Sequence, residues 1–557
     1  MKKLFIILLS LCVVSVAGFA GQRSYKIWKQ RRLLGQARVY TEKGDPANAI
    51  LSLRLALQTN PNNLEAAKMM GDFTELARSP QSLLWRSRIV ELEPDSLSNR
   101  VALARVASGM GDAATARKAL EGADAASKKT SLYHAVAGSV ELTAGRLSEA
   151  EDHFSEAARI EPGNPSSALN LASLRLQRTD PTASAEARSS LQALSAGTNP
   201  PVRLEALRQL TFDALRHTNH TAALGYSSKV IQETNSGFPD RMLHIDLLKG
   251  TTAAQLWPYL AKLQAESTDH SAKAYELAKW ILRNDGPGPV LTWLRSLPPA
   301  TRLGLPVPMI EADTLIAAKD WTTLATNLST QTWGELDSLR LACRSRAFRE
   351  QNLPSAAKAE WIQAMKSARA RSDVLAQLLN TVALWHWESE VEDVLWAMIA
   401  RNPNEPAVLE VLSNRLLKAG KTRGLMTLYA QVADGNKTNY QAKNNLAMTA
   451  LLLEEWSKRP HELSQEVFRT APTNAAFAST YAYSLLLQKK IAESLSVFEQ
   501  LPVSQLQEPG ISAYYGLALK SAGQTEKSAR YLAMAAKGKF LPEEQLLLDR
   551  ASRSPAP

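Results

Sequence analysis

Apolar and small residues recur at helical spacing along most of this chain, and the pattern is most complete between Ser131 and Asn164. In the second half of this stretch, Ala150, Phe154 and Ala157 are separated by four and three residues, which places them on one face of a helix. A Gly-Arg pair interrupts the periodicity in the middle, and Pro162 ends it because proline cannot continue a helix. The stretch therefore predicts two short helices joined by a turn.

Small residues mark the places where the two predicted helices cross. Gly138, Ala150 and Ala157 leave room for a close approach, and Phe154 fills the space beside them. Together with Pro162 they form a 34-residue pattern that resembles the tetratricopeptide (TPR) repeat. The resemblance implies an all-α fold in which antiparallel helix pairs stack into a superhelix with a concave groove.

The same pattern returns along the chain, which makes the resemblance specific for the fold. It covers about residues 33–180 and 339–540, and it is weak between them. The first unit carries Ala37, Tyr40, Ala49, Leu53, Ala56 and Pro61, and the last clear unit carries Tyr514, Leu517, Ala518, Gly523, Leu532 and Ala535. Leu541–Arg550 predicts a final helix, because an open repeat stack needs an end piece over its last apolar face.

The predicted architecture is an all-α, TPR-like α-solenoid with one N-terminal transmembrane helix, resembling membrane-anchored bacterial TPR proteins. Prolines punctuate a middle part in which the repeat decays, and no sustained apolar-polar alternation there supports strands. The predicted parts are a signal anchor at 1–22, a basic juxtamembrane segment at 23–32, an N-terminal TPR block at 33–196, a divergent helical-repeat middle at 197–338, and a C-terminal TPR block with a capping helix at 339–557.

The N-terminus carries an uncharged apolar run from Leu4 to Ala20. At about 1.5 Å per residue it is just long enough to cross the hydrocarbon core of a bilayer. A cleaved signal peptide and a retained anchor both fit this run. We favour the anchor, because Tyr25, Trp28 and several basic residues follow it as an interfacial belt.

The net charge of +11 comes mainly from this N-terminal region. Residues 1–32 hold seven of the 65 basic residues and no acidic one, so the other 58 nearly balance the 54 acidic residues. This distribution favours contact with a membrane surface and argues against a nucleic-acid-binding domain. We therefore expect a single-pass protein of the cytoplasmic (inner) membrane. We favour an extracytoplasmic, periplasmic position for its large domain, with the cytoplasmic side as the alternative.

Sequence motifs of enzymes are not found in this chain. It has no Walker loop, no GxGxxG after a strand, no HExxH and no GxSxG, so we expect neither catalysis nor a cofactor. The two cysteines, Cys12 and Cys343, exclude a disulfide framework and a cysteine zinc cluster, and no metal is expected. Cys343 is predicted to pack as a small buried hydrophobe.

The TPR resemblance implies a partner-binding groove lined by four positions of each first helix. At these positions the early units carry Arg38, Arg105 and Ser139, and we add Asn445 from the C-terminal block as a fourth candidate. The two arginines are suited to an acidic segment, although exposed arginines are usually only solvated. The Lys/Asn clamp of chaperone-binding TPR domains is absent from these units, so that ligand is not carried over.

These features predict a membrane-tethered TPR scaffold that binds a protein or peptide partner in its groove. By architecture alone, it resembles components of cell-envelope assembly, including exopolysaccharide and protein export. One alternative is a glycan-binding or enzyme-accessory protein that uses tryptophans of the divergent middle, namely Trp257, Trp280, Trp293 and Trp321. Another is a structural spacer without a single ligand.

Overall fold

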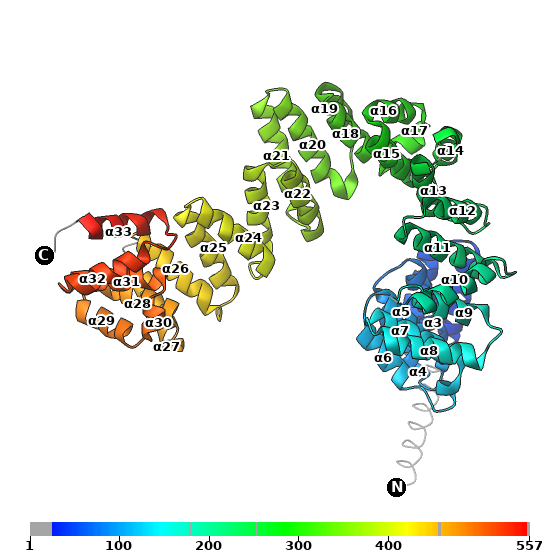
Figure 1. Ribbon diagram of the computed structural model, residues 1–557, viewed down its shortest axis with the longest axis horizontal. Coiled ribbons are helices and arrows are strands. Elements are labelled where there is room, and N and C mark those ends of the chain that lie inside the picture. Colours follow the sequence, from blue (N-terminus) through cyan, green and yellow to red (C-terminus); the bar gives the residue numbers. More distant parts are fainter. Residues whose placement is uncertain (1–24, 179, 252, 455–457, 554–557) are drawn as a thin grey trace, which may run out of the picture. The chain divides into compact units, whose positions relative to one another are not determined.

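Helices are the only regular structure in the part of the chain that the computed structural model describes, which comprises residues 25–178, 180–251, 253–454 and 458–553. The chain divides into two compact units, one that ends at Glu266 and one that begins at Ser267. Within each unit, successive helices pack in antiparallel pairs (Figure 1). The described residues are therefore all-α and TPR-like, as the repeats predict.

The described part of the N-terminal unit begins with a helix at residues 25–42. This helix continues without a break from the predicted basic segment into the first predicted repeat. The helices that follow are α2 (Pro46–Thr59), α3 (Leu64–Leu76), α4 (Gln81–Leu92), α5 (Leu97–Gly109), α6 (Ala113–Glu121), α7 (Ser131–Thr143), α8 (Leu147–Ile160), α9 (Pro165–Arg175), α10 (Pro181–Ser195), α11 (Pro200–Arg216), α12 (His220–Val230), α13 (Phe238–Thr251) and α14 (Ala253–Ser267).

The pair α7 and α8 shows how the sequence sets these elements. Thr130 caps the start of α7, where its hydroxyl accepts a hydrogen bond from the amide of Tyr133 at 3.2 Å. Gly145 turns the chain between the helices with φ of 75°, a conformation that favours glycine. Phe154 is buried against Gly138 across the pair. The predicted two-helix unit is thus confirmed.

The C-terminal unit is also a succession of helices. They are α15 (Ser271–Asp285), α16 (Pro287–Ser296), α17 (Pro299–Leu303), α18 (Val307–Ala318), α19 (Trp321–Thr330), α20 (Asp337–Glu350), α21 (Pro354–Ala368), α22 (Ser372–Leu384), α23 (Glu388–Arg401), α24 (Pro406–Lys418), α25 (Thr422–Gly435), α26 (Tyr440–Leu452), α27 (Arg459–Thr470), α28 (Ala475–Leu487), α29 (Ile491–Glu499), α30 (Val503–Leu506), α31 (Pro509–Ser521), α32 (Thr525–Ala535) and α33 (Pro542–Arg553).

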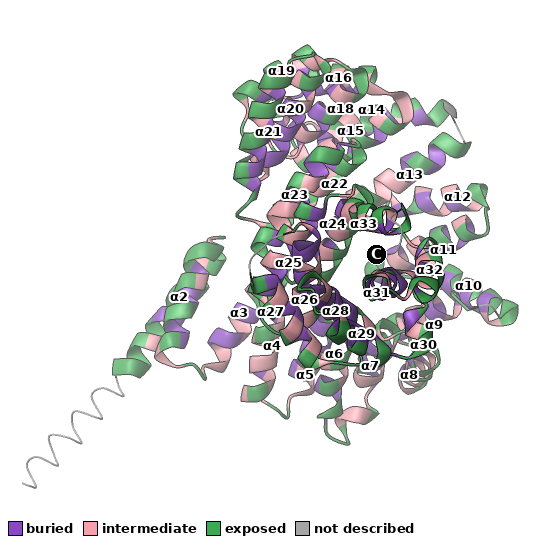
Figure 2. Cartoon of the chain, turned by 90° about the vertical axis from the view of Figure 1, so that its left-hand side faces the viewer, coloured by how far each residue is buried: buried purple, intermediate pink, exposed green. Residues whose placement is uncertain are grey.

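Prolines that punctuate the middle of the sequence lie at the starts of helices. Pro200, Pro287 and Pro299 are the first residues of α11, α16 and α17, and Pro308 lies in the first turn of α18. Proline suits this position because the first turn has no helical partner for an amide hydrogen. Figure 2 shows buried residues on the helix sides that face neighbouring helices, so the divergent repeats still form an apolar interior.

The final helix, α33, does more than cover the last repeat. It packs against α31 and α32, as the predicted capping helix would. It also reaches α25, where the carboxylate of Glu543 accepts a hydrogen bond from the Thr422 hydroxyl. The carboxylate of Glu544 accepts one from the Tyr514 hydroxyl. The end of the chain is therefore fixed to several repeats of its unit.

The predicted membrane segment at residues 4–20 lies outside the described residues. No helix in the described part is long and apolar enough to cross a membrane. The described chain begins with Tyr25 and Trp28, whose side chains are exposed, and the guanidinium of Arg32 lies 5.5 Å from the centre of the Trp28 ring.

Candidate partner-binding surface

The candidate groove residues of the N-terminal unit lie on three different first helices. Arg38 is exposed, and its Nε donates a hydrogen bond to Glu65 at 3.0 Å, so its charge is already paired. Arg105 is exposed on α5 and forms no ion pair with any residue that the structure describes. Ser139 is exposed on α7, and its hydroxyl donates to the carbonyl of Ala135 in its own helix at 3.1 Å. No contact joins the three side chains.

Asn445 belongs to the C-terminal unit and lies half-buried on α26. Its side-chain oxygen accepts a hydrogen bond from Gln441 at 3.1 Å. The neighbouring Asn444 is buried, and its own side-chain oxygen has no partner among the described residues. The role of all four predicted residues in binding stays a prediction.

Two tryptophan side chains gather around Arg346 on α20. Its guanidinium lies between two indole rings, 4.8 Å from the centre of Trp385 and 5.7 Å from the centre of Trp321. Tryptophan is the aromatic residue that attracts a cation most strongly, and a planar guanidinium stacks well on its ring. We refer to Trp321, Arg346 and Trp385 as the Trp-Arg-Trp cluster.

Turns between helices position the two indoles of the Trp-Arg-Trp cluster. Trp321 is the first residue of α19, directly after Asp320, whose carboxylate accepts from the amide of Thr323 at 3.1 Å. Trp385 caps the end of α22, and the next residue, His386, has φ of 56°. The cluster therefore joins side chains from α19, α20 and α22 across more than one helix pair.

Arg346 carries hydrogen-bonding capacity that the chain leaves unused. Its Nε is buried without a partner, and the guanidinium forms no hydrogen bond or ion pair with the residues that the structure describes. Burial lowers the pKa of Arg346, and the charges of Glu350 and Asp313 offset only part of this effect. A buried donor without a partner is costly, and the guanidinium's unused donors make Arg346 a candidate for binding an acceptor group.

The neighbouring Arg349 provides a contrast. Its guanidinium lies 3.7 Å from the centre of the Trp387 ring and forms an ion pair with Glu390. The ring of Trp387 is buried, and it packs edge-on against Trp385 at 5.0 Å. The charge of Arg349 is thus paired with the carboxylate of Glu390, whereas Arg346 forms no ion pair with the described residues.

Arg346 is not among the candidate residues named from the sequence, although the groove positions of its repeat point to it. In the repeat that contains Ala357, Trp361 and Ala364, the same positions fall on Leu339, Ala342, Arg346 and Arg349. The two flanking tryptophans could not have been assigned in this way, because Trp321 begins α19 and Trp385 follows α22, both outside those positions.

Two of the four tryptophans proposed for glycan binding are buried. Trp280 and Trp293 are buried in the interior of the C-terminal unit, with 2% and 9% of their surface exposed. Trp321 belongs to the Trp-Arg-Trp cluster, and Trp257 is exposed on α14 of the N-terminal unit. Stacking on a sugar requires an accessible ring face, which the two buried indoles do not offer.

Cys343 is buried on α20, as the sequence predicts, and burial raises the pKa of its thiol to about 12. Because only the thiolate is nucleophilic, we expect the thiol to react extremely slowly with Ellman's reagent at pH 8 in the native protein and rapidly in 6 M guanidinium. The measurement uses a Cys12→Ser variant, so that one thiol is observed. Rapid labelling of the native protein would show that Cys343 is accessible, contrary to its burial.

Three solved structures of helical proteins resemble this chain distantly. No protein-family model matches the sequence, and no curated protein matches it. The structure of Pseudomonas aeruginosa pilF is 14% identical and covers 41% of this chain and 99% of its own, with a TM-score of 0.29. A chain of the APC/C hetero-tetramer Cut9-Hcn1 is 11% identical over 95% of this chain and 98% of its own, with a TM-score of 0.26. The TPR domain of P58(IPK) is 12% identical over 94% of this chain and 99% of its own, with a TM-score of 0.23. The helix pairs described above, and not these alignments, define the architecture as TPR-like.

Proposed function

We propose that this protein is a membrane-tethered TPR-like scaffold that binds an extended segment of a protein partner at its first helices, without catalysing a reaction of its own. The Trp-Arg-Trp cluster is the observation that carries this proposal. It offers a fixed guanidinium with free donors between two aromatic rings, which is suited to a carboxylate or main-chain carbonyl of a peptide. Tryptophan and arginine are also the residues that most often dominate the energy of protein interfaces.

The proposed tether is the apolar run at residues 4–20, and the residues that follow it support a position at the membrane. Tyr25 and Trp28 expose their rings at the start of the first described helix, beside Lys26, Lys29 and Arg32. Aromatic and basic side chains of this kind are typical of the membrane-water interface. We place the protein in the inner membrane with its helical repeats outside the cytoplasm, where it would hold a partner during envelope assembly or export.

Photo-crosslinking in cells tests the binding site. A photoreactive amino acid at Asn380, which is exposed on α22, should form an adduct with a discrete protein. We expect Arg346→Glu to reduce this adduct about tenfold, because the charge reversal repels the partner's acceptor group. Arg295→Glu makes the same charge change at an exposed site on α16 and should leave the adduct unchanged.

If Arg346→Glu and Arg295→Glu gave equal amounts of adduct, the partner would bind elsewhere and the Trp-Arg-Trp cluster would not be the binding site. If no adduct forms while the purified protein turns over a substrate, the scaffold proposal is wrong. Reporter fusions after residue 32 and at the C-terminus test the tether separately. We expect a reporter that is active only outside the cytoplasm to be active at the C-terminus, and activity of a cytoplasmic reporter there would contradict the proposed orientation.

A further inference from the structure

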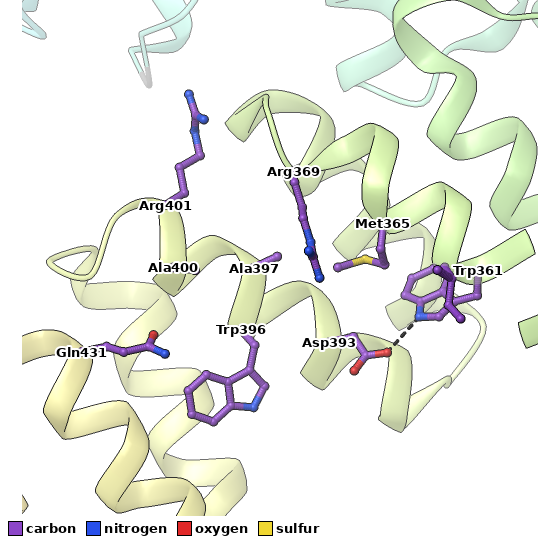
Figure 3. Close-up of a pocket in the computed structure, with 10 residues that line it drawn as sticks. Trp361, Met365, Arg369, Asp393, Trp396, Ala397, Ala400, Arg401 and Gln431 are labelled. Carbon is purple, nitrogen blue, oxygen red and sulfur yellow. Dashed lines mark hydrogen bonds between the residues drawn. The ribbon is translucent and has the colours of Figure 1, made fainter. Parts of the chain in front are cut away.

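A pocket of about 650 Å³ lies among second helices of the C-terminal unit, away from the Trp-Arg-Trp cluster. Its lining residues come from α21, α23, α25 and the residue that caps the end of α21 (Figure 3). The volume is within the range of about 300–1,000 Å³ that ligand pockets of proteins occupy. The expected groove of a TPR-like stack is lined by first helices, so this pocket is a separate surface.

Two indoles and a thioether give the pocket its apolar part. Trp361 is 6% exposed, and its indole nitrogen donates a hydrogen bond to the carboxylate of Asp393 at 2.8 Å, which fixes the ring (Figure 3). Met365 lies one turn further along α21, and Trp396 contributes a half-buried ring from α23. Because Trp361 is held in place, this wall is formed before any partner binds, which reduces the entropy lost on binding.

The polar part of the pocket offers groups that are not paired with charges among the described residues. Arg369 extends from the end of α21 toward Met365 and Ala397, and it forms no hydrogen bond or ion pair with the described residues (Figure 3). The side-chain oxygen of Gln431 is buried without a partner. Arg401, also at the pocket, donates a hydrogen bond to the Ser372 hydroxyl at 2.7 Å and forms no ion pair within the described part of the chain. The pocket therefore carries excess positive charge, which is complementary to a carboxylate.

The surroundings indicate an extended ligand. A hollow of about 560 Å³ adjoins the pocket and shares Trp361 and Asp393 with it, and another of about 620 Å³ shares Trp396. Ile362, one of the lining residues, exposes 54% of its surface and extends the apolar area from the pocket onto the surface of the protein. A row of hollows along α23 with an apolar margin suits a peptide segment better than a compact small molecule.

We propose that this pocket binds a peptide segment of a protein partner, which inserts one large apolar side chain against the half-buried ring of Trp396 and places a neighbouring carboxylate on Arg369. The site is independent of the Trp-Arg-Trp cluster, so the two surfaces allow the scaffold to hold two segments at once. Asp393 is a positioning residue here, because its carboxylate is engaged by Trp361.

Selection from a random peptide display library on the purified full-length protein tests the proposal. We expect selected peptides to carry a large apolar residue within a few positions of Asp or Glu. Measured by fluorescence polarisation, their affinity should fall at least tenfold in Trp396→Ala and in Arg369→Glu. Lys366→Glu changes the same charge on the exposed side of α21 and should have no effect. A second selection on Arg369→Glu should favour Lys or Arg in place of the acid.

Peptides that bind both pocket variants as tightly as the native protein would overturn the proposal, and so would failure to select any peptide. Arg346→Gln separates the two surfaces, because it should leave binding to this pocket unchanged. If Arg346→Gln abolishes binding, the peptides occupy the Trp-Arg-Trp cluster and the pocket proposal is wrong. Arg369→Glu alters an exposed side chain, so it remains informative even if Trp396→Ala fails to fold.

Discussion

Replacing Gly138 with alanine is expected to destabilise the N-terminal unit by about 1–3 kcal/mol. A Cβ atom at this position would lie 2.6 Å from two carbons of the Phe154 ring, closer than real contacts allow. The ring cannot move aside easily, because it is buried against Ala150 and Leu174. The small residue that the repeat pattern specifies at position 138 is therefore required by the packing of α7 on α8.

A double-mutant cycle identifies the cause of this loss. Phe154→Ala alone should cost about 3–5 kcal/mol, since it leaves a cavity between the helices. The combined Gly138→Ala and Phe154→Ala variant should cost clearly less than the sum, because the new methyl group occupies part of that cavity. Hydrogen exchange of α7 and α8, together with urea unfolding followed by circular dichroism, measures these effects.

Gly225 provides the matched control for Gly138. It lies inside α12 with open space where a Cβ would be, so Gly225→Ala should stabilise the unit by about 0.4–1 kcal/mol. Additive losses in the double mutant would contradict the clash with Phe154, and so would equal effects at the two glycines.

Removal of α33 by truncation before Phe540 is expected to cost the C-terminal unit about 3–6 kcal/mol. Leu548 in this helix and Leu541 directly before it are both buried, and each buried leucine contributes about 1.5–3 kcal/mol. Hydrogen exchange should increase in α31 and α32, which lose their cover, and also at the start of α25, which loses the contact of Glu543 with Thr422. If hydrogen exchange increases in α32 alone, α33 covers the last repeat without stabilising α31 or the start of α25.

The contribution of α33 should depend on pH through Glu544. Burial raises the pKa of this carboxyl, while hydrogen bonds from Tyr514 and the amide of Leu541 act in the opposite direction. A group whose pKa is higher in the folded state contributes most stability below its unfolded pKa of about 4.5, and this contribution is lost as the pH rises through the folded value. We therefore expect Glu544→Gln to stabilise the unit at pH 7 and to weaken its pH dependence between pH 4 and 7.

Urea unfolding at several pH values measures this dependence on pH. The glutamine amide can replace both interactions, because its oxygen accepts from the Leu541 amide and its nitrogen donates to the Tyr514 oxygen. Glu543→Gln is the control, since Glu543 lies next to Glu544 on the same helix but accepts from the Thr422 hydroxyl instead. A loss of stability in Glu544→Gln at pH 7 would mean that the ionised carboxylate is needed for docking of α33.

Local sequence was sufficient to predict the helix pairs. The pattern between Ser131 and Asn164 predicts α7 and α8, because helical period, a turn glycine and a terminal proline act within a few residues of each other. The same signals place prolines at the starts of α11, α16 and α17, even where the repeat itself has decayed. The small residue at Gly138 was also predictable, since its partner Phe154 lies in the same repeat.

Contacts between repeats were decided only by the tertiary structure. Arg346 meets Trp321 and Trp385 because three helices present side chains to one place, and helical period does not fix how one repeat is rotated against the next. Trp361 meets Asp393 from the following repeat for the same reason. The sequence by itself thus determined which segments are helices and which of their faces are apolar, because those properties are local. The surfaces proposed to bind partners arise where separate repeats pack together, and the geometry of that packing depends on the whole set of side chains between them.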